Sequence, residues 1–239
     1  MEILLLISLA IILYTYFGYG VIITLLAKLK KKHSIEELKD DDLPEITLLI
    51  AAYNEEEIIL EKIKNTLKLD YPSAKFNISF VTDGSSDETN AIIQKHSEVN
   101  LFYKKERKGK NAAINRVMPL VKTPICIFSD ANVMINSNAL RAIVKHFQNN
   151  LTGAVSGEKV VLQEQVDGAS ASGEGFYWKY ESFLKRKDAE WNTLVGSAGE
   201  FFAIRTHLYE NILESTLIED FLLTMKIAQK ASIRSWIYN

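Results

Sequence analysis

Polar side chains directly follow three short apolar segments of the sequence, and their types suit the binding of a charged ligand. The three groups are Tyr53-Asn54-Glu55 after Ile46–Ala52, Asp83 after Phe76–Val81, and Asp130-Ala131-Asn132 after Pro124–Phe128. Because one residue separates Asp130 from Asn132, strand alternation would direct both side chains to the same side. Their two oxygens suit a hard cation such as Mg²⁺ or Mn²⁺ held with a diphosphate, although a polar turn accounts for the same pattern.

Three further segments carry polar residues for which the sequence alone leaves two explanations. Asp83–Asp87 could bind a ligand or form a turn with a helix cap at Ser86 or Asp87. The run Lys108-Gly109-Lys110-Asn111 is either a flexible basic loop that approaches phosphate or a solvated turn. Glu219 and Asp220 open a predicted helix, where acids are common because the helix dipole favours them.

The elements that must position these residues alternate between strands and helices. Strands are predicted at 46–52, 76–81, 100–104, 124–128, 154–162, 200–205 and 233–238. Helices are predicted from a cap at Asn54 to 67, then at 89–98, 110–121, 138–148, 175–187 and 219–230, with a loop at 163–172. Alternation with short links is typical of parallel strands with crossover helices, in an open α/β sheet whose ligands bind at the carboxyl ends of the strands. The absence of GxGxxG and GxxxxGK[ST] patterns disfavours a dinucleotide site and a P-loop.

Composition narrows the class of protein. With 28 basic and 30 acidic residues, the formal net charge is −2, which excludes a strongly basic nucleic-acid binder, so no nucleic-acid partner is predicted. One cysteine excludes an intramolecular disulfide framework, and four scattered histidines leave no HxxxH zinc site. That cysteine, Cys126, lies in a predicted buried strand, where a reduced thiol is expected.

The N-terminal segment differs from the rest of the chain. Ile3–Ala27 is a run of 25 uncharged residues, and as a helix it would reach roughly 37 Å, enough to cross a membrane core. Four lysines follow within Lys28–Lys32, which places this end on the cytoplasmic side. We therefore predict a single-pass anchor in the inner (cell) membrane, with the N-terminus outside and the following domain in the cytoplasm. The alternative is a buried core helix.

The chain is predicted to divide into three parts. Residues 1–32 form the anchor, residues 33–45 form a linker or short exposed helix, and residues 46–239 form the soluble domain. That domain is divided into 46–135 and 136–239, and the resemblance given below implies that these are a nucleotide-binding half and an acceptor-side half. The aromatic residues of the anchor (Tyr14, Tyr16, Phe17 and Tyr19) are expected to pack against a helix from outside this chain.

Taken in order, the polar segments resemble the motifs of family-2 glycosyltransferases with the GT-A fold. The matching segments are Tyr53-Asn54-Glu55, Asp83–Thr89, Lys108–Asn115, Asp130-Ala131-Asn132, Gly199–Arg205 and Glu219-Asp220. The match covers nearly all of Ile46–Gln229. The N-terminal helix with Tyr16–Tyr19 further resembles the membrane-bound branch that includes cellulose, chitin, hyaluronan and poly-N-acetylglucosamine synthases.

The resemblance implies a fold, a reaction and a set of site residues. The fold is an open mixed sheet flanked by helices, and the reaction is inverting, metal-dependent transfer from a nucleotide-sugar, a UDP-sugar, to a saccharide or lipid-linked acceptor. Asp220 would be the general base, and Asp130 and Asn132 would hold Mg²⁺ or Mn²⁺. Asp83 would bind the uracil or ribose. The other implied donor residues are Ala52, Tyr53, Glu55, Lys110, Asp130 and Asn132, and the implied acceptor residues are Gly199, Glu200 and Glu219.

Two departures from the family pattern leave alternatives open. Asn132 stands where the family has a second carboxylate, so metal affinity is expected to be lower. Arg234-Ser235-Trp236 does not match the Gln-x-x-Arg-Trp element of this branch, so we expect a truncated form or a fragment. One alternative is a non-catalytic, membrane-anchored nucleotide-sugar-binding subunit with partners in a membrane complex. A nucleotidyltransferase is another alternative, but a Gly-rich phosphate loop is not visible after Ile50.

Overall fold

A computed structural model describes residues 1–30, 35–158, 169–193, 196–197, 199–230 and 234–237. The chain forms two compact units. The larger comprises Ile35–Lys159 and Val195–Asn239, and the smaller comprises Met1–Ser34 and Val160–Leu194. The smaller unit thus takes up a segment that the sequence analysis assigned to the acceptor-side half of the soluble domain.

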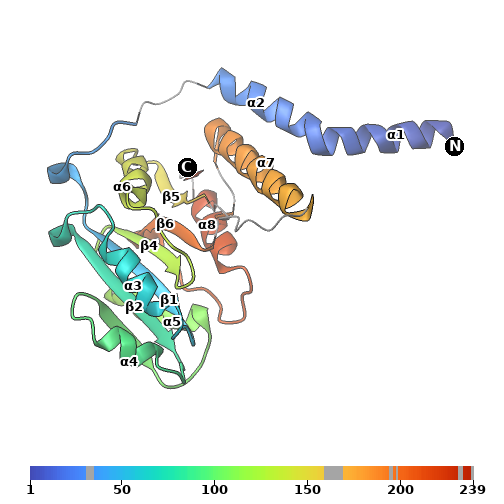
Figure 1. Ribbon diagram of the computed structural model, residues 1–239. Helices are drawn as coiled ribbons and strands as arrows, with labels where there is room; N and C mark the ends of the chain where they lie inside the picture. Colours follow the sequence, from blue (N-terminus) through green and yellow to red (C-terminus); the bar gives the residue numbers. More distant parts are fainter. Residues whose placement is uncertain (31–34, 159–168, 194–195, 198, 231–233, 238–239) are drawn as a thin grey trace. The chain divides into compact units, whose positions relative to one another are not determined.

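The larger unit is built on one mixed sheet (Figure 1). Its strands are β1 (Ile46–Ala52), β2 (Phe76–Asp83), β3 (Asn100–Lys104), β4 (Ile125–Asp130), β5 (Thr152–Ser156), β6 (Phe201–Arg205) and β7 (Arg234–Ile237). They lie in the order β3-β2-β1-β4-β6-β5-β7. The first four strands in the chain are parallel, as predicted, whereas β6 runs antiparallel to both β4 and β5. The carboxyl ends of β1, β2 and β4 therefore meet at one edge.

Helices cover both faces of the sheet because side chains alternate along the buried strands. On one face, Ile46, Leu48 and Ile50 of β1 pack with side chains from α3 (Ile59–Leu67), α4 (Thr89–Gln94) and α6 (Ala139–Val144). On the other face, Leu49 packs with side chains from α5 (Lys110–Val117) and α8 (Glu219–Gln229). Cys126 is fully buried in β4, as predicted.

Several predicted element bounds were wrong. Asn54 does not cap a helix; it has φ 53°, its Oδ1 accepts a hydrogen bond from the Ser86 backbone, and α3 begins only at Ile59. The predicted helix 110–121 ends as an α-helix at Val117, and the 3₁₀ turn Met118–Leu120 follows because it contains a proline. The helices predicted at 89–98, 138–148 and 219–230 are likewise shorter, whereas the helix predicted at 175–187 is longer and spans Ala169–Trp191. Further 3₁₀ turns lie at Ser73–Lys75, Lys145–Gln148 and Thr206–Leu208.

The predicted loop 163–172 was also partly wrong. The helix α7 (Ala169–Trp191) begins within it, and residues 163–168 lie outside the described residues. The strand predicted at 154–162 is β5, which ends at Ser156; its predicted residues 159–162 are likewise outside the described part of the chain.

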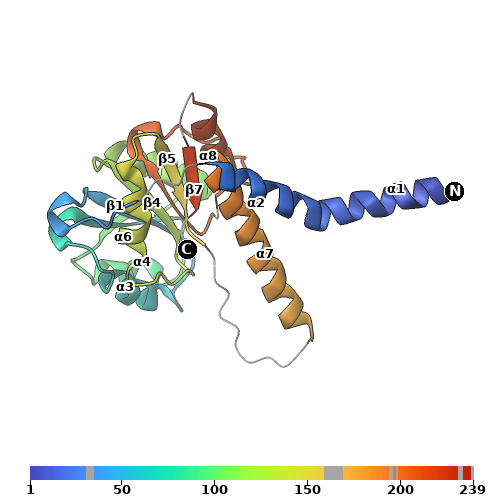
Figure 2. The same cartoon turned by 90° about the horizontal axis from the view of Figure 1, so that it is seen from above.

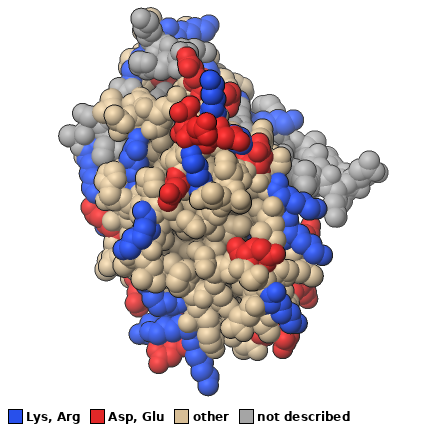
Figure 3. Space-filling view, turned by 90° about the vertical axis from the view of Figure 1, so that its left-hand side faces the viewer, with Lys and Arg blue, Asp and Glu red and all other residues tan. Residues whose placement is uncertain are grey.

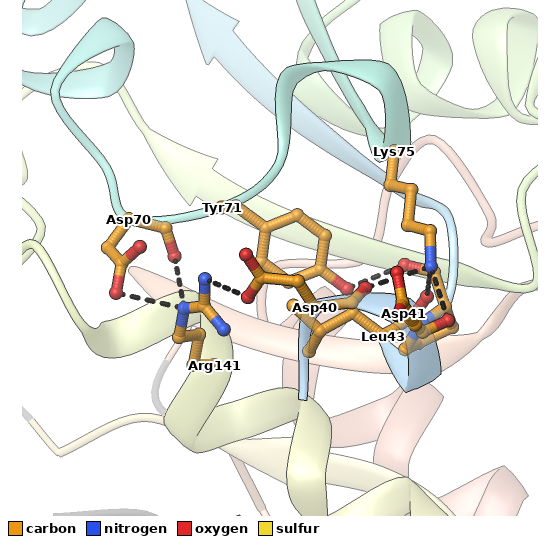
Figure 4. Close-up of polar contacts among 8 residues, drawn as sticks. Asp40, Asp41, Leu43, Asp70, Tyr71, Lys75 and Arg141 are labelled. Carbon is orange, nitrogen blue, oxygen red and sulfur yellow. Dashed lines mark hydrogen bonds and ion pairs between the residues drawn. The ribbon is translucent and has the colours of Figure 1, made fainter. Parts of the chain in front are cut away.

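Part of the predicted linker is fixed to the sheet unit (Figure 4). It contains the exposed 3₁₀ turn Asp40–Asp42. Arg141 of α6 forms ion pairs with Asp40 at 2.7 Å and with Asp70 at 2.9 Å, so it joins this segment to the loop after α3. Lys75 Nζ donates to three carbonyls of the segment, those of Asp40 (3.0 Å), Asp41 (2.7 Å) and Leu43 (2.8 Å). The predicted linker is therefore attached to the sheet unit at Asp40–Leu43.

The smaller unit contains the N-terminal helix and α7. The helix consists of α1 (Glu2–Leu13), a π-helical segment (Tyr14–Gly18) and α2 (Tyr19–Leu29). It is 28 residues long, with a mean hydropathy of 2.0, so it is long and apolar enough to cross a membrane. None of the residues of α1 is buried, which disfavours the alternative of a core helix.

The aromatic residues of this helix find a partner within the chain. In Figures 1 and 2, α7 runs beside α2. Tyr19 OH donates to Asp188 Oδ1 at 2.5 Å, and Tyr180 OH donates to the Tyr16 carbonyl. The expectation that the anchor aromatics need a helix from outside the chain was therefore wrong for Tyr19, because the sequence analysis treated α7 as part of the soluble domain.

Charged side chains of both signs are interspersed on the face shown in Figure 3, around a central area of uncharged residues. Charge on this face is therefore mixed, in keeping with the formal net charge of −2.

Candidate active site

A cavity of about 270 Å³ opens at the sheet edge where β1, β2 and β4 end. All seven residues predicted to bind a nucleotide-sugar line it: Ala52, Tyr53, Glu55, Asp83, Lys110, Asp130 and Asn132. They come from three strand ends and the first turn of α5, so segments up to 80 positions apart in the chain meet here. The position agrees with the rule that open α/β sheets bind ligands at strand carboxyl ends.

Asp83 fixes the basic loop at one side of the cavity. It is 5% exposed, and its Oδ2 accepts hydrogen bonds from the backbone N–H groups of Lys108 and Gly109, the latter at 2.7 Å. Its Oδ1 lies 3.3 Å from Arg116 Nη1. Asp83 thus holds the start of α5 in place, in addition to its predicted contact with the nucleoside. Asp87 Oδ1 accepts a hydrogen bond from the Thr89 backbone N–H, but the N-cap of α4 is Glu88 and not Ser86 or Asp87 as predicted.

Lys110 joins a predicted donor residue to a predicted acceptor residue. Its ammonium lies 2.7 Å from Asp130 Oδ1 and 2.8 Å from Glu219 Oε1. Burial lowers the pKa of Lys110, but the hydrogen bonds with these two carboxylates outweigh that effect and raise the pKa overall. Lys110 is therefore a firmly charged cation at the centre of the site.

Asp130 and Asn132 lie together at the cavity, but not for the predicted reason. Asp130 ends β4, whereas Asn132 belongs to the turn that follows, so strand alternation does not orient it. The Asp130 backbone N–H donates to the carbonyl of Glu200 at 3.2 Å, which brings one predicted acceptor residue beside the donor site. Among the described residues, His, Cys, Asp and Glu form no cluster of three or more that could hold a metal.

These residues nevertheless suit a divalent cation shared with a ligand. The Asp130 carboxylate already accepts an ammonium ion, and the Asn132 amide is exposed at the cavity. Two protein oxygens completed by phosphate oxygens and water are a common arrangement for Mg²⁺, which rarely has an all-protein cage.

The predicted acceptor residues border the same place. Gly199 and Glu219 line a small hollow together with Lys110 and Asp130. A Cβ on Gly199 would lie 3.0 Å from Asp220 Oδ2, so the absence of a side chain lets this carboxylate approach. Asp220 is half-buried in the first turn of α8. Burial raises the pKa of the Asp220 carboxyl above its usual value, and the charge of Glu219 raises it further.

Glu55 is a second carboxyl with a raised pKa. Burial is the main cause, followed by the charges of Asp130 and Asp87. Its backbone N–H donates to Thr89 Oγ1 at 2.8 Å, which joins the end of β1 to the start of α4. The crowding of carboxylates at this edge favours the binding of a cation there.

The sequence analysis missed a buried lysine beneath the Asp130 turn. Lys62 of α3 is 0% exposed, and its ammonium donates to Ser129 Oγ at 2.8 Å and to the Val133 carbonyl. It therefore holds both ends of the turn that carries Asp130 and Asn132. Burial lowers the pKa of Lys62 to about 7, against the opposing charge of Asp130. In the sequence Lys62 appears only as a charged residue on a helix, with no signal that it is buried.

Replacing Lys62 with Met is expected to change how stability depends on pH. Because the pKa of Lys62 falls from an ordinary lysine value to about 7 on folding, the unfolded state binds more protons between pH 7 and about 10. Wild-type stability should therefore rise across this window, by at most about 1.4 kcal/mol per pH unit from this group. Lys62→Met should lose that slope while keeping a similar volume. Urea denaturation of both proteins at pH 7, 8 and 9 measures how the free energy of unfolding changes with pH. If it changes equally in the two proteins, the lowered pKa of Lys62 is refuted.

The sequence analysis also missed the arginine that covers Tyr53. The Arg107 guanidinium lies 3.9 Å from the centre of the Tyr53 ring, a cation–π contact on the wall of the cavity. The loop of Arg107 can approach because Gly84 has φ +73° and no Cβ; a Cβ there would lie 2.7 Å from the Arg107 Cβ. The signal in the sequence was the position of Arg107 within the basic run that ends at Lys110.

Replacing Gly84 with Ala is expected to destabilise the protein by about 2 kcal/mol, because the residue would combine positive φ with a steric clash. Gly109→Ala is the matched control. Gly109 also has positive φ, at +95°, but a Cβ there would meet nothing within 4 Å. Chemical denaturation should show a larger loss of unfolding free energy for Gly84→Ala than for Gly109→Ala. Equal losses would mean that the clash with Arg107 does not destabilise the protein.

The architecture is that of the GT-A fold, with the cavity at the carboxyl ends of the strands. The solved structure of mannosyltransferase PcManGT from Pyrobaculum calidifontis, in complex with GDP-Man and Mn²⁺, superposes with a TM-score of 0.74; the match has 22% identity and covers 97% of this chain and 67% of that one. The crystal structure of S. aureus TarS residues 1–349 in complex with UDP-GlcNAc superposes with a TM-score of 0.58. That match has 21% identity and covers 81% of this chain and 55% of the TarS chain.

Sequence comparison identifies the family. The family model described as glycosyl transferase family 2 matches residues 47–213. The chain therefore belongs to glycosyl transferase family 2, and both the predicted family and the predicted fold are confirmed.

Two curated relatives show the range of products within the family. The chain is 26% identical over 215 residues to a beta-monoglucosyldiacylglycerol synthase of Trichormus variabilis, covering 83% of this chain and 44% of the relative. It is 33% identical over 125 residues to a poly-beta-1,6-N-acetyl-D-glucosamine synthase of Staphylococcus aureus, and this match covers 51% of this chain and 30% of the relative. The chain thus spans less than half the length of these relatives.

Proposed function

We propose that this chain is an inverting, metal-dependent glycosyltransferase that moves a sugar from a nucleotide-sugar, in the first instance a UDP-sugar, to a lipid-linked or saccharide acceptor. The single observation that carries the proposal is the convergence of all seven donor residues on one cavity, with Asp220 on its acceptor side. Family membership supports it, and so do the two structural neighbours, which are complexes with GDP-Man and with UDP-GlcNAc.

Each charged group has a role in this reaction. Tyr53, Glu55 and Asp83 would line the nucleoside pocket, and Lys110 would contact the diphosphate. Asp130 and Asn132 would hold Mg²⁺ or Mn²⁺, which when bound offsets the negative charge on the departing nucleoside diphosphate. The Asp220 carboxylate would take the proton from the acceptor hydroxyl as that oxygen attacks the anomeric carbon.

Exposed aliphatic side chains on the acceptor side favour a lipid-linked acceptor. Leu213, Leu217 and Ile218 precede Glu219 and are 74%, 94% and 62% exposed. The backbone of the loop that carries them is held at two points, because Asn111 Nδ2 donates to the carbonyls of Leu213 (3.3 Å) and Thr216 (2.8 Å). A hydroxyl that reaches Asp220 past this loop would meet apolar surface, which suits a lipid-bearing molecule.

The N-terminal helix would anchor the enzyme in a membrane. Its exposed apolar surface and the lysines after it support a single span with the N-terminus outside and the sheet unit at the cytoplasmic face.

Ligand binding and transfer assays test this function. With Mn²⁺, saturating UDP or GDP should raise the melting temperature of the full chain, and a hundredfold excess over Kd corresponds to about 2.7 kcal/mol. Transfer from radiolabelled UDP-glucose, UDP-GlcNAc and GDP-mannose to diacylglycerol or to a β-linked GlcNAc oligomer then identifies the donor and acceptor. If none of these nucleotides or nucleotide-sugars raised the melting temperature, the proposal would be refuted. Binding without transfer would favour the alternative of a non-catalytic subunit.

A further inference from the structure

One cation is shared by the two sides of the candidate active site. Lys110 Nζ lies 2.7 Å from Asp130 Oδ1 and 2.8 Å from Glu219 Oε1. Asp130 ends β4 on the donor side, and Glu219 begins α8 beside Asp220 on the acceptor side. The three side chains are 37%, 29% and 16% exposed, so the bridge is partly shielded from water. Partial burial strengthens such charge interactions relative to those at a free surface.

This bridge places Lys110 where a divalent ion would otherwise bind. An ion on Asp130 Oδ1 must take that oxygen from the ammonium, because the ammonium already occupies hydrogen-bonding distance. Two cations within a few ångströms of each other repel strongly in a partly buried site. Lys110 and a divalent ion therefore compete for Asp130 as long as nothing else draws the ammonium away.

A nucleoside diphosphate supplies the missing negative charge. Its phosphate oxygens would give the Lys110 ammonium a new partner within the same cavity, and Asp130 would become available to the ion that enters with the diphosphate. The same movement takes the cation away from Glu219. Glu219 would then be a free acceptor of hydrogen bonds, one residue from the proposed base.

We propose that the Lys110 ammonium occupies the place of the divalent ion at Asp130 until the nucleotide-sugar donor binds. When the ammonium then moves to the diphosphate, Glu219 loses its ion pair and becomes able to bind the acceptor. This inference rests on the proposed function, since it describes regulation of the same site. Donor and metal bind together, and the acceptor side is completed only afterwards. A site built this way keeps Glu219, the residue next to the proposed base, paired with Lys110 until a sugar is in place.

Manganese binding to the full chain in detergent, without nucleotide, tests the proposal. Free Mn²⁺ is measured by electron paramagnetic resonance in the wild type, Lys110→Met and Lys108→Met. Lys108 is exposed and lies two residues away, so its replacement removes the same charge without breaking the bridge. Lys110→Met should bind Mn²⁺ about tenfold more tightly than the wild type, whereas Lys108→Met should differ by about twofold or less.

The controls separate this inference from the proposed function. Lys110→Gln repeats the measurement with a polar side chain in case the methionine variant does not fold, and thermal melting verifies both. Unchanged or weaker Mn²⁺ binding in the Lys110 variants, or equal gains in Lys108→Met, would overturn the inference. UDP and GDP binding by the wild type with Mn²⁺ is measured in parallel: if neither binds, the proposed function fails, while the comparison made without nucleotide still decides whether Lys110 competes with the metal.

Discussion

Asp220→Asn should lower kcat by roughly a thousandfold while leaving the Kd for UDP with Mn²⁺ within about twofold of the wild type. The substitution keeps the size and hydrogen-bonding capacity of the side chain but removes its ability to take a proton. Nucleotide binding should persist because Asp220 does not line the donor cavity. Single-turnover transfer and calorimetric UDP binding measure the two quantities. Glu214→Gln, an exposed carboxyl in the preceding loop, is the control and should keep wild-type activity.

The same variant has an effect on stability whose sign follows from its pKa. Burial raises the pKa of Asp220, so the native state binds this proton more tightly than the unfolded state does. Stability from this group is therefore greatest at low pH and falls as pH rises through the raised pKa. At pH 7 Asp220→Asn should melt at a higher temperature than the wild type, and the two should converge in acid. Full activity in Asp220→Asn, or lost UDP binding, would remove Asp220 from the role of base.

The sequence was informative wherever a local pattern and the function coincide. Short apolar runs with polar residues after them identified the ends of β1, β2 and β4, because parallel strands place their carboxyl ends together. All seven predicted donor residues followed from this pattern and from the resemblance, and they line one cavity. The order of motifs also predicted the family that the comparison confirms.

What the sequence missed depends on contacts between distant segments. Lys62 lies on α3, and its role depends on Ser129 in β4, 67 positions further along the chain, and on Val133 after the turn. Arg107 reaches Tyr53 only because Gly84 adopts positive φ, and local propensity carries no information about that approach. The association of α7 with α2 was missed for the same reason, because Tyr19 and Asp188, which share a hydrogen bond, are 169 positions apart in the chain.

The structure also gives Asp83 a role that the resemblance did not imply. The resemblance assigned it to the nucleoside, and the structure shows a carboxylate that already accepts two backbone N–H groups of the Lys108–Gly109 loop. That loop begins α5 and therefore positions Lys110. Asp83 can thus influence the diphosphate site through the backbone as well as through any direct contact with a nucleoside.

Asp130→Asn is expected to have the second large effect, a loss of Mn²⁺-dependent UDP binding by about a hundredfold or more. The amide keeps the shape of the side chain but cannot supply a negative charge to a divalent ion, and Asn132 is already neutral. The substitution also removes one partner of Lys110, so the ammonium would pair with Glu219 alone. Calorimetric titration of UDP with and without Mn²⁺ measures the effect: binding without metal should change little, because the nucleoside pocket remains intact.

Asn132→Asp provides the opposite change at the neighbouring position. A second carboxylate at the cavity should raise Mn²⁺ affinity about tenfold, because each added charge strengthens the attraction for a divalent ion. If Asp130→Asn bound UDP with Mn²⁺ as tightly as the wild type and Asn132→Asp gave no gain, the ion would not be held here. The charge on the diphosphate would then have to be offset by Lys110 itself, which is already within ion-pair distance of Asp130.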